Sequence, residues 1–362
     1  MIYFIVFFVL LLVIFLSETV RTSKLNRNRL RCSCGVLLAI ILILLAGLRY
    51  NNWTDWDMYY NYFKKGTNTS NDIEIGYKYW NLVVFSFIQN YNVFLLLSYG
   101  VLLSIFYKVS KGFAGNAFLF SFVVLYSCYF LSSGGFRQFI AEQLFVLSFY
   151  LYSQRRFFVC TTVLVIAFLF HRTIILVLPF LLLLKINFGL KSFLLLVCFC
   201  AVLQLSNFFV TLLDIALPQV NLLEIDSLST RMNLYSKRDL DMSLLSFGFM
   251  RKFLFCIFYI YISQKRDNQD NIYRQLVNLY IIGLLLSMVL PGEFNRFSIY
   301  FLYFECFILP ISFSALPKNI SRRVKYIISI ILFIAFSNRL LSSDPHLYFP
   351  YNCVLSSSLV PL

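Results

Sequence analysis

The residues of this chain whose types suit chemistry are arginines, carboxylates and His171, set in an otherwise apolar sequence. His171 and Arg172 interrupt an apolar run from 157 to 184, in the stretch FLFHRTIILVLPF. Charge is expensive in hydrocarbon, so ionisable residues against membrane segments are functional candidates by default. The competing interpretation is that arginines at helix ends extend their charge to the lipid headgroups.

The combination of these residue types indicates phosphate and acid–base chemistry. Arginines bind phosphate or diphosphate oxygens in a bidentate manner, and a histidine or carboxylate can deprotonate a hydroxyl nucleophile. With a lipid tail held in the bilayer, the group predicts an enzyme acting on a lipid-linked phosphate. We predict the catalytic residues to be His171, Asp57 and Glu293, and the substrate-binding residues to be Arg49, Asp55, Arg137, Gln138, Arg172, Arg231 and Arg296.

Arg137 is the strongest phosphate-contact candidate. It follows Gly134-Gly135, which permit a sharp turn before a helix that begins near Gln138. An arginine at a helix N-terminus opposes the helix dipole unless an anion lies there. Glu142, about one turn further along, is the expected local partner. His171 has three open roles: a base, a phosphate donor or a structural turn residue.

Asp55-Trp56-Asp57 invites a metal interpretation, but two carboxylates without a third ligand are a weak site. An ion pair with Arg49 or another basic residue, or binding of sugar hydroxyls, is favoured, and neither a metal nor another cofactor is predicted. Tyr59, Tyr60 and Tyr62 offer stacking faces for a sugar or belong to an interfacial aromatic belt.

The elements that position these residues are expected to be membrane helices. The chain has 362 residues, of which 60% are hydrophobic and 13% charged, against about 25% charged in soluble domains. We predict an all-α, polytopic integral membrane helical bundle of about 10–12 transmembrane segments, several of them short or re-entrant. Residues 1–342 should form one transmembrane domain with extracytoplasmic loops near 49–90 and 214–247, followed by a C-terminal tail, 343–362. The longer loop is either a lid over the site or a plain solvated loop.

The net charge of +15 is explained by the positive-inside rule rather than by nucleic acid. If the apolar spans all cross, 18 of the 31 lysines and arginines lie in short loops on one side. This threading requires a turn at His171-Arg172 and places that pair on the outer face. The alternative, one tilted helix over 157–184, would invert every later basic loop.

Several of these stretches resemble EpsG-like, Wzy-type polysaccharide polymerases. The similar segments are GLRYNNWTDWDMYYNYF, IEIGYKYW, the run from GGFRQFIAEQ to FLFHRT, and PGEFNRFSIYF, which together span about 45–305. By position, Arg49, Asp57, Arg137, Gln138, His171 and Arg296 fall on family-like motifs.

The resemblance implies a fold of GT-C-like character in the bacterial inner membrane, with its site on the periplasmic face. It implies glycosyl transfer that joins undecaprenyl-diphosphate-linked repeat units into O-antigen, capsule or exopolysaccharide. The lipid-linked glycan is both donor and acceptor, membrane lipids surround the enzyme, and a chain-length regulator is a further expected partner. Two alternatives stay open: another polyprenyl-lipid-dependent glycosyltransferase such as an O-antigen ligase, and a flippase for the same lipid-linked unit.

Overall fold

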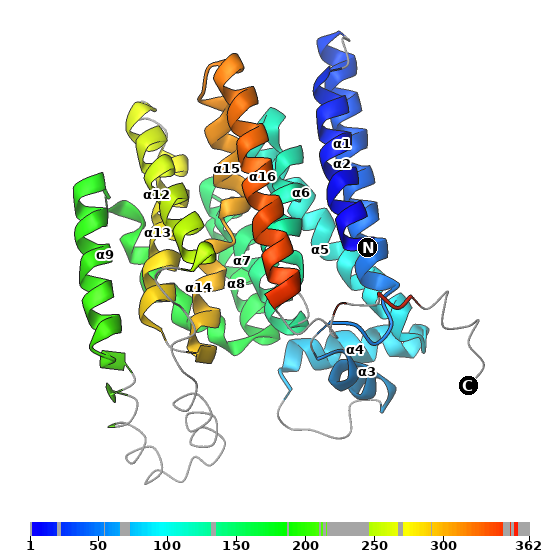
Figure 1. Cartoon of the computed structure of the whole chain (residues 1–362). Coiled ribbons are helices and arrows are strands. Elements are labelled where there is room, and N and C mark those ends of the chain that lie inside the picture. The colour runs from blue at the N-terminus through cyan, green and yellow to red at the C-terminus, as the bar shows by residue number, and fades with distance from the viewer. Residues whose placement is uncertain are drawn as a thin grey trace. The chain divides into compact units, whose positions relative to one another are not determined.

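The computed structural model describes residues 2–19, 23–53, 55–65, 73–131, 135–186, 188–209, 211–212, 215, 246–266, 271–290, 292–342, 348 and 351–353. Within these ranges the chain is helical and forms no β-strand, only an isolated antiparallel bridge between Arg49 and Cys353. The all-α fold predicted from composition is confirmed (Figure 1).

Six helical segments of the described chain are long and apolar enough to cross a membrane. They are Ile2–Thr19, Leu25–Gly47, Tyr91–Ala117, Asn271–Val289, Arg296–Ser314 and Lys318–Leu341, with shorter apolar helices at Leu119–Cys128, Phe157–Phe170 and Leu190–Leu205. Large apolar side chains such as Phe8 and Leu12 are more than half exposed, as surfaces facing lipid require. The chain is therefore a multi-pass membrane protein.

The chain divides into two compact units, the first formed by Met1–Ile174 with Leu309–Leu362 and the second by Ile175–Ile308. The prediction that residues 1–342 act as one domain stays a prediction.

The first unit is built on long antiparallel helices. It contains α1 (Ile2–Thr19), α2 (Lys24–Gly47), α5 (Tyr91–Ala114), α6 (Leu119–Cys128), α7 (Phe136–Ser153), α8 (Phe157–Phe170) and α16 (Lys318–Ser342). Small residues allow close packing: a Cβ on Gly112 of α5 would lie 2.4 Å from the Tyr150 ring of α7.

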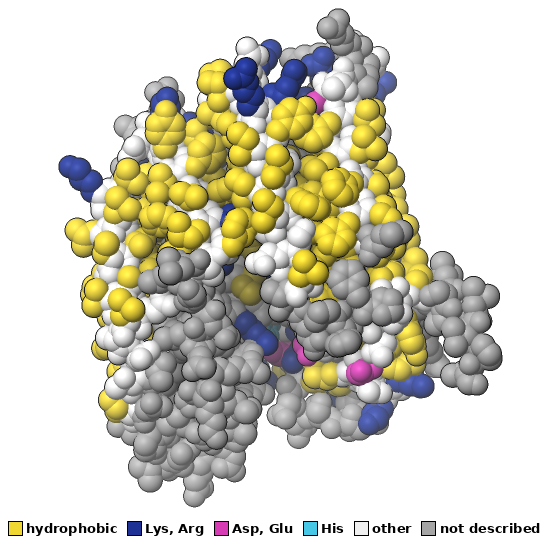
Figure 2. Space-filling model, viewed as in Figure 1, with side chains coloured by type: hydrophobic (Ala, Val, Ile, Leu, Met, Phe, Trp, Pro, Cys, Tyr) yellow, Lys and Arg dark blue, Asp and Glu magenta, His cyan; other side chains and the backbone are white. Residues whose placement is uncertain are grey.

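The basic turns of this unit lie at one end of its helices. There Lys111 Nζ lies 3.3 Å from Cys32 Sγ, and Lys325 Nζ donates to Glu18 Oε1 at 2.5 Å. At the opposite end, the Asn92 amide of α5 donates to the carbonyls of Gly47 and Arg49. Figure 2 shows hydrophobic side chains along α1 and α16, and Lys and Arg side chains gathered where α16 begins.

Segment 49–90, predicted as an extracytoplasmic loop, contains two helices, α3 (Trp56–Lys64) and α4 (Ile75–Phe87). On α3 the buried aromatic residues Trp56, Tyr59, Tyr62 and Phe63 recur every three to four positions, which is the period of a helix with one apolar face. Both helices lie across the end of the first unit that is remote from its basic turns (Figure 1).

Gly76, in the first turn of α4, allows this helix to approach the end of α8. A Cβ at that position would lie 2.9 Å from the backbone carbonyl of Leu169. The glycine thereby brings the N-terminus of α4 against the last turn of α8, two residues before His171.

The second unit packs α9 (Leu190–Leu205), α12 (Phe247–Lys265), α13 (Asn271–Val289) and α14 (Arg296–Leu302), joined to α15 (Glu305–Ser314). A buried ion pair between Arg251 of α12 and Glu305 holds the unit internally, with the Glu305 side chain fully buried. Asn278 of α13 donates to the carbonyls of Leu184 and Ile186, which lie at the end of the 3-10 helix η3 (Arg172–Lys185).

The helix break predicted at His171 is confirmed. Helix α8 ends at Phe170, His171 has extended backbone angles (φ −156°, ψ 110°), and η3 starts at Arg172. Residues 157–184 are therefore not one continuous helix. The side of the membrane on which this break lies stays a prediction.

Candidate functional site

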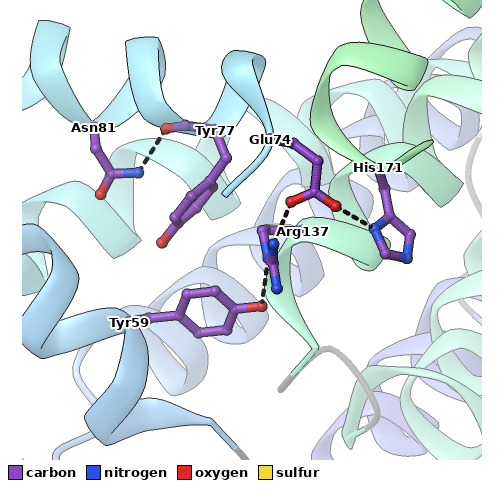
Figure 3. Close-up of polar contacts among 6 residues, drawn as sticks. All are labelled: Tyr59, Glu74, Tyr77, Asn81, Arg137 and His171. Carbon is purple, nitrogen blue, oxygen red and sulfur yellow. Dashed lines mark hydrogen bonds and ion pairs between the residues drawn. The ribbon is translucent and has the colours of Figure 1, made fainter. Parts of the chain in front are cut away.

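Glu74 is the centre of a polar group at the end of the first unit remote from the basic turns. One of its carboxylate oxygens accepts a hydrogen bond from Arg137 Nη1, and the other lies 3.0 Å from His171 Nδ1. Arg137 Nε in turn donates to the Tyr59 hydroxyl at 3.3 Å. Figure 3 shows Glu74 between the side chains of Arg137 and His171, with Tyr59 on the far side of Arg137. Residues 74, 137 and 171 thus form one connected network.

Each member of the network comes from the end of a different helix. Glu74 is the N-cap of α4, Arg137 is the second residue of α7, and His171 is the C-cap of α8, while Tyr59 projects from α3. A helix end leaves backbone groups unpaired and gives the side chain room to turn away from the helix axis. The ends of α4 and α8 meet because Gly76 lets α4 pack against α8.

The contact with Glu74 determines which nitrogen of His171 is available for chemistry. A carboxylate accepts, so the neutral imidazole that best fits this contact carries its proton on Nδ1 and leaves Nε2 as an acceptor. Nε2 has no hydrogen-bond partner in the described part of the chain, and the side chain is 21% exposed. Figure 3 shows this nitrogen on the side of the ring away from Glu74. His171 is placed to take a proton from an incoming group.

Glu74 is held in its ionised form. Its side chain is only 11% exposed, and this burial by itself raises the pKa of a carboxyl group. The hydrogen bond from His171 and the charge of Arg137 outweigh burial, so the net effect lowers the pKa of Glu74. The negative charge needed to orient His171 and hold Arg137 is therefore present at neutral pH.

The predicted partner of Arg137 is wrong. Glu142 lies inside α7, is 5% exposed and hydrogen-bonds to Gln138, whereas the ion pair of Arg137 is made with Glu74, 63 residues away in the chain. Arg137 also lies over the Tyr59 ring, with its Cζ 5.8 Å from the centroid. The anion expected at this helix N-terminus is thus provided, in this structure, by the protein itself.

Arg49 lies outside the Glu74 group, in an aromatic cage. It is 1% exposed, its Nη1 donates to the Tyr99 hydroxyl at 3.1 Å, and its Cζ lies 4.1 Å from the centroid of the Trp53 ring. Among the described residues no carboxylate forms a salt bridge with it, so the predicted ion pair with Asp55 or Asp57 is absent there. The cage holds the cation through ring quadrupoles and one hydroxyl.

Comparison of the whole chain with protein families matches residues 33–353 to the EpsG family. The chain belongs to the EpsG family. No match is found among curated proteins or among solved structures. Family membership supports a polysaccharide-polymerase type of function, in agreement with the resemblance of the motifs.

Three of the remaining predicted residues, Asp55, Asp57 and Arg172, make no described hydrogen bond or ion pair with the network. Asp55 and Asp57 are exposed at the start of α3, and Arg172 is exposed directly after His171. Arg296 begins α14 in the second unit. Arg231 lies outside the described residues, as does the side chain of Glu293. Where the structure describes side chains, no group of three or more His, Cys, Asp and Glu residues is arranged to hold a metal ion.

The sequence assigns no role to Glu74, and it offers Tyr59 only as a stacking face or a member of an aromatic belt. Glu74 stands in the segment IEIGYKYW, whose E-x-G-Y motif gives the residue no role by itself. The sequence feature that could have indicated its role is a glycine two residues after the glutamate, at the start of a helix. A glycine there allows another helix to pack closely beside the carboxylate.

Proposed function

We propose that this EpsG-family protein polymerises undecaprenyl-diphosphate-linked oligosaccharide units into a surface polysaccharide at the outer face of the bacterial inner membrane. The observation that carries the proposal is the His171–Glu74–Arg137 network. It places a histidine with a free Nε2 beside an arginine, at the end of the first unit opposite its basic turns. By the positive-inside rule the basic end is cytoplasmic, which puts the network outside.

In the proposed reaction a hydroxyl of the acceptor unit attacks the anomeric carbon of the donor glycan. A new C–O bond forms as the bond to the polyprenyl diphosphate breaks, and the hydroxyl proton passes to Nε2 of His171. Glu74 acts as a positioning residue, because its carboxylate orients the ring and stabilises the imidazolium that the transfer creates. The arrangement of carboxylate, histidine and hydroxyl follows the logic of other acyl- and group-transfer sites.

The leaving diphosphate requires positive charge, and the network limits which residues supply it. With His171 neutral, the charges of Arg137 and Glu74 cancel, so Arg137 alone is a weak counter-ion. We assign Arg172 as a further diphosphate contact, since it is exposed and adjacent to His171. Arg231 and Arg296 stay proposed contacts from the rest of the chain. Of the three proposed bases, His171 is favoured over Asp57 and Glu293 because its Nε2 is both oriented and free.

The decisive experiment is the surface-glycan ladder of a deletion strain complemented with variants at matched protein levels. Wild type should restore long chains, and His171→Ala and Glu74→Gln should leave single, unpolymerised units. Glu18→Gln, which removes a carboxylate from the ion pair with Lys325 at the basic end, is the matched control and should restore the ladder. Normal ladders from His171→Ala and Glu74→Gln would exclude the site.

The same strain separates the two alternative functions. Loss of a polymerase leaves one repeat unit on its acceptor, loss of a ligase leaves none, and loss of a flippase traps the lipid-linked unit on the cytoplasmic face. The sidedness is tested with Arg172→Cys and Arg156→Cys and a membrane-impermeant maleimide. We expect labelling from outside only at position 172, and labelling of that position from the cytoplasm alone would refute the topology.

A further inference from the structure

A groove of about 400 Å³ opens on the first unit beside α3 and the start of α5. Its lining combines aromatic rings with amide and amino groups, unlike the apolar surfaces that face lipid. The lining residues are Tyr50, Tyr60, Phe63, Lys64, Phe85, Gln89, Asn90, Tyr91 and Asn92. A concave site of this size with convergent polar groups is typical of small-ligand binding.

The aromatic residues that line the groove pack against the buried ring of Trp56. The Trp56 ring stacks on Tyr60 at 4.7 Å between centroids, and it meets the edges of Tyr50 and Tyr91 at 5.1 and 5.8 Å. Tyr50 is nevertheless 42% exposed, so a ring held in place by its neighbours remains open to a ligand. Rigid, half-exposed rings offer faces on which the C–H groups of a sugar can pack at little entropic cost.

The polar groups of the groove differ in how far the fold already uses them. Asn90 caps α5 through its side-chain oxygen, and Asn92 donates to two backbone carbonyls, so both side chains already form hydrogen bonds within the fold. Gln89 is exposed and makes no side-chain hydrogen bond within the described chain. Tyr91 is 4% exposed, and its hydroxyl has no hydrogen-bond partner among the described residues. The Gln89 side-chain amide therefore offers the groove a donor and an acceptor for a ligand with hydroxyl groups.

The groove adjoins the Glu74 network through α3. Tyr59 contacts Arg137 of the network, and the next residue, Tyr60, lines the groove. Consecutive residues of a helix point about 100° apart, so α3 separates the two features and presents one residue to each. The groove and the network therefore lie on neighbouring faces of the same helix.

We propose that this groove is a saccharide subsite, which holds a sugar of the glycan next to the one that reacts. The inference rests on the proposed function for the identity of the glycan. The subsite orients its ligand through the faces of Tyr50 and Tyr60 and through hydrogen bonds from Gln89, and it binds the sugar portion without the lipid diphosphate. Lys64, whose Nζ lies 5.5 Å from the centroid of the Tyr60 ring, closes one rim.

The test measures binding of lipid-free oligosaccharides, prepared by partial acid hydrolysis of the strain's own surface polysaccharide. Saturation-transfer NMR on the full-length protein in detergent gives the affinity for wild type, Tyr50→Ala, Tyr50→Phe and Gln89→Ala. Tyr79→Ala is the matched control, because Tyr79 is 63% exposed on α4 and lies outside the groove.

We expect Tyr50→Ala and Gln89→Ala to weaken binding at least fivefold, with shorter glycan chains in the complemented strain. Tyr50→Phe and Tyr79→Ala should bind as wild type does. Unchanged binding by both groove variants would overturn the subsite, and so would the failure of wild type to bind any fragment. Either result leaves the polymerase proposal standing, because the ladder of the deletion strain decides that proposal independently.

Discussion

Glu74→Gln is the substitution that isolates the electrostatic part of the network. Glutamine has nearly the shape of glutamate and can still accept a hydrogen bond from His171, but it carries no charge. At the 3.0 Å separation of Glu74 Oε1 and His171 Nδ1, and with an effective dielectric constant of about 20, a full pair of charges interacts by about 5.5 kcal/mol. Partial exposure of both side chains, 11% and 21%, and the nearby Arg137 reduce this to about 2–3 kcal/mol.

That energy is available only when the imidazolium forms, so it belongs to the transition state of glycosyl transfer. A loss of about 2–3 kcal/mol lowers the rate by about 30- to 150-fold. The assay is polymerisation by purified protein in proteoliposomes, with lipid-linked units extracted from the deletion strain. We expect kcat to fall by that factor while KM for the lipid-linked unit changes little, since Glu74 is assigned no substrate contact.

The substitution also leaves Arg137 without its counter-ion, so protein amount must be controlled. A partly buried pair lies between exposed pairs and fully buried ones in its contribution, and we expect a loss of stability of about 1–2 kcal/mol. Rates are therefore normalised to folded protein measured by size exclusion. A Glu74→Gln rate within twofold of wild type would refute the reasoning, and so would a defect confined to KM.

Three further predictions concern packing and titration. Gly76→Ala should separate α4 from α8, which should lower the free energy of unfolding by about 1–3 kcal/mol and reduce polymerisation. Gly100→Ala is the control, because a Cβ at that position meets nothing within 4 Å, and it should be neutral or stabilising. Equal melting temperatures for the two variants would contradict the close approach of α4 and α8. The pKa of Glu74 is lower in the folded chain than its ordinary value of 4.5, so its ionised form stabilises the fold above that pH, and this contribution is lost as pH falls through the lowered pKa. The melting-temperature difference between wild type and Glu74→Gln should accordingly shrink as pH falls below about 4.5, and a difference that grows over that acidic range would be inconsistent with it. Glu305→Gln should destabilise the second unit by about 3–5 kcal/mol because it removes the negative charge paired with the buried Arg251. The double variant Arg251→Met/Glu305→Leu should recover most of that loss in a thermal unfolding experiment.

Features that depend on neighbouring residues were predictable from the sequence. Apolar runs separated by basic turns predicted the membrane helices, because hydrophobicity and helix length are local properties. The break at His171 followed from the charges on both sides of 157–184, and the start of a helix near Gln138 followed from the glycines before it. The helices α3 and α4 were missed because the 49–90 segment mixes aromatic and polar residues and its helices are too short to span a bilayer.

Pairings between distant residues were not predictable. The sequence favoured Glu142 as the partner of Arg137 because the two lie about one helical turn apart, yet burial of Glu142 inside α7 takes it away from that role. Arg49 offered the same signal as Arg137, an arginine at a helix end beside carboxylates, but it is buried in an aromatic cage. Spacing along the chain predicts which residues are neighbours on one helix, but it does not predict which residues of different helices lie together.

By itself, the sequence determined that the chain is a multi-pass helical membrane protein with polar residues at selected helix ends, and its motifs marked the EpsG family. Only the tertiary structure decided that Glu74, Arg137 and His171 act together. Arg137 and His171 lie 63 and 97 positions from Glu74 in the chain. The carboxylate of Glu74 reaches the imidazole of His171 because α4 packs against α8 through Gly76. Helix formation is governed by local hydrogen bonds and solvation, whereas the convergence of helix ends depends on packing that no short stretch of sequence contains.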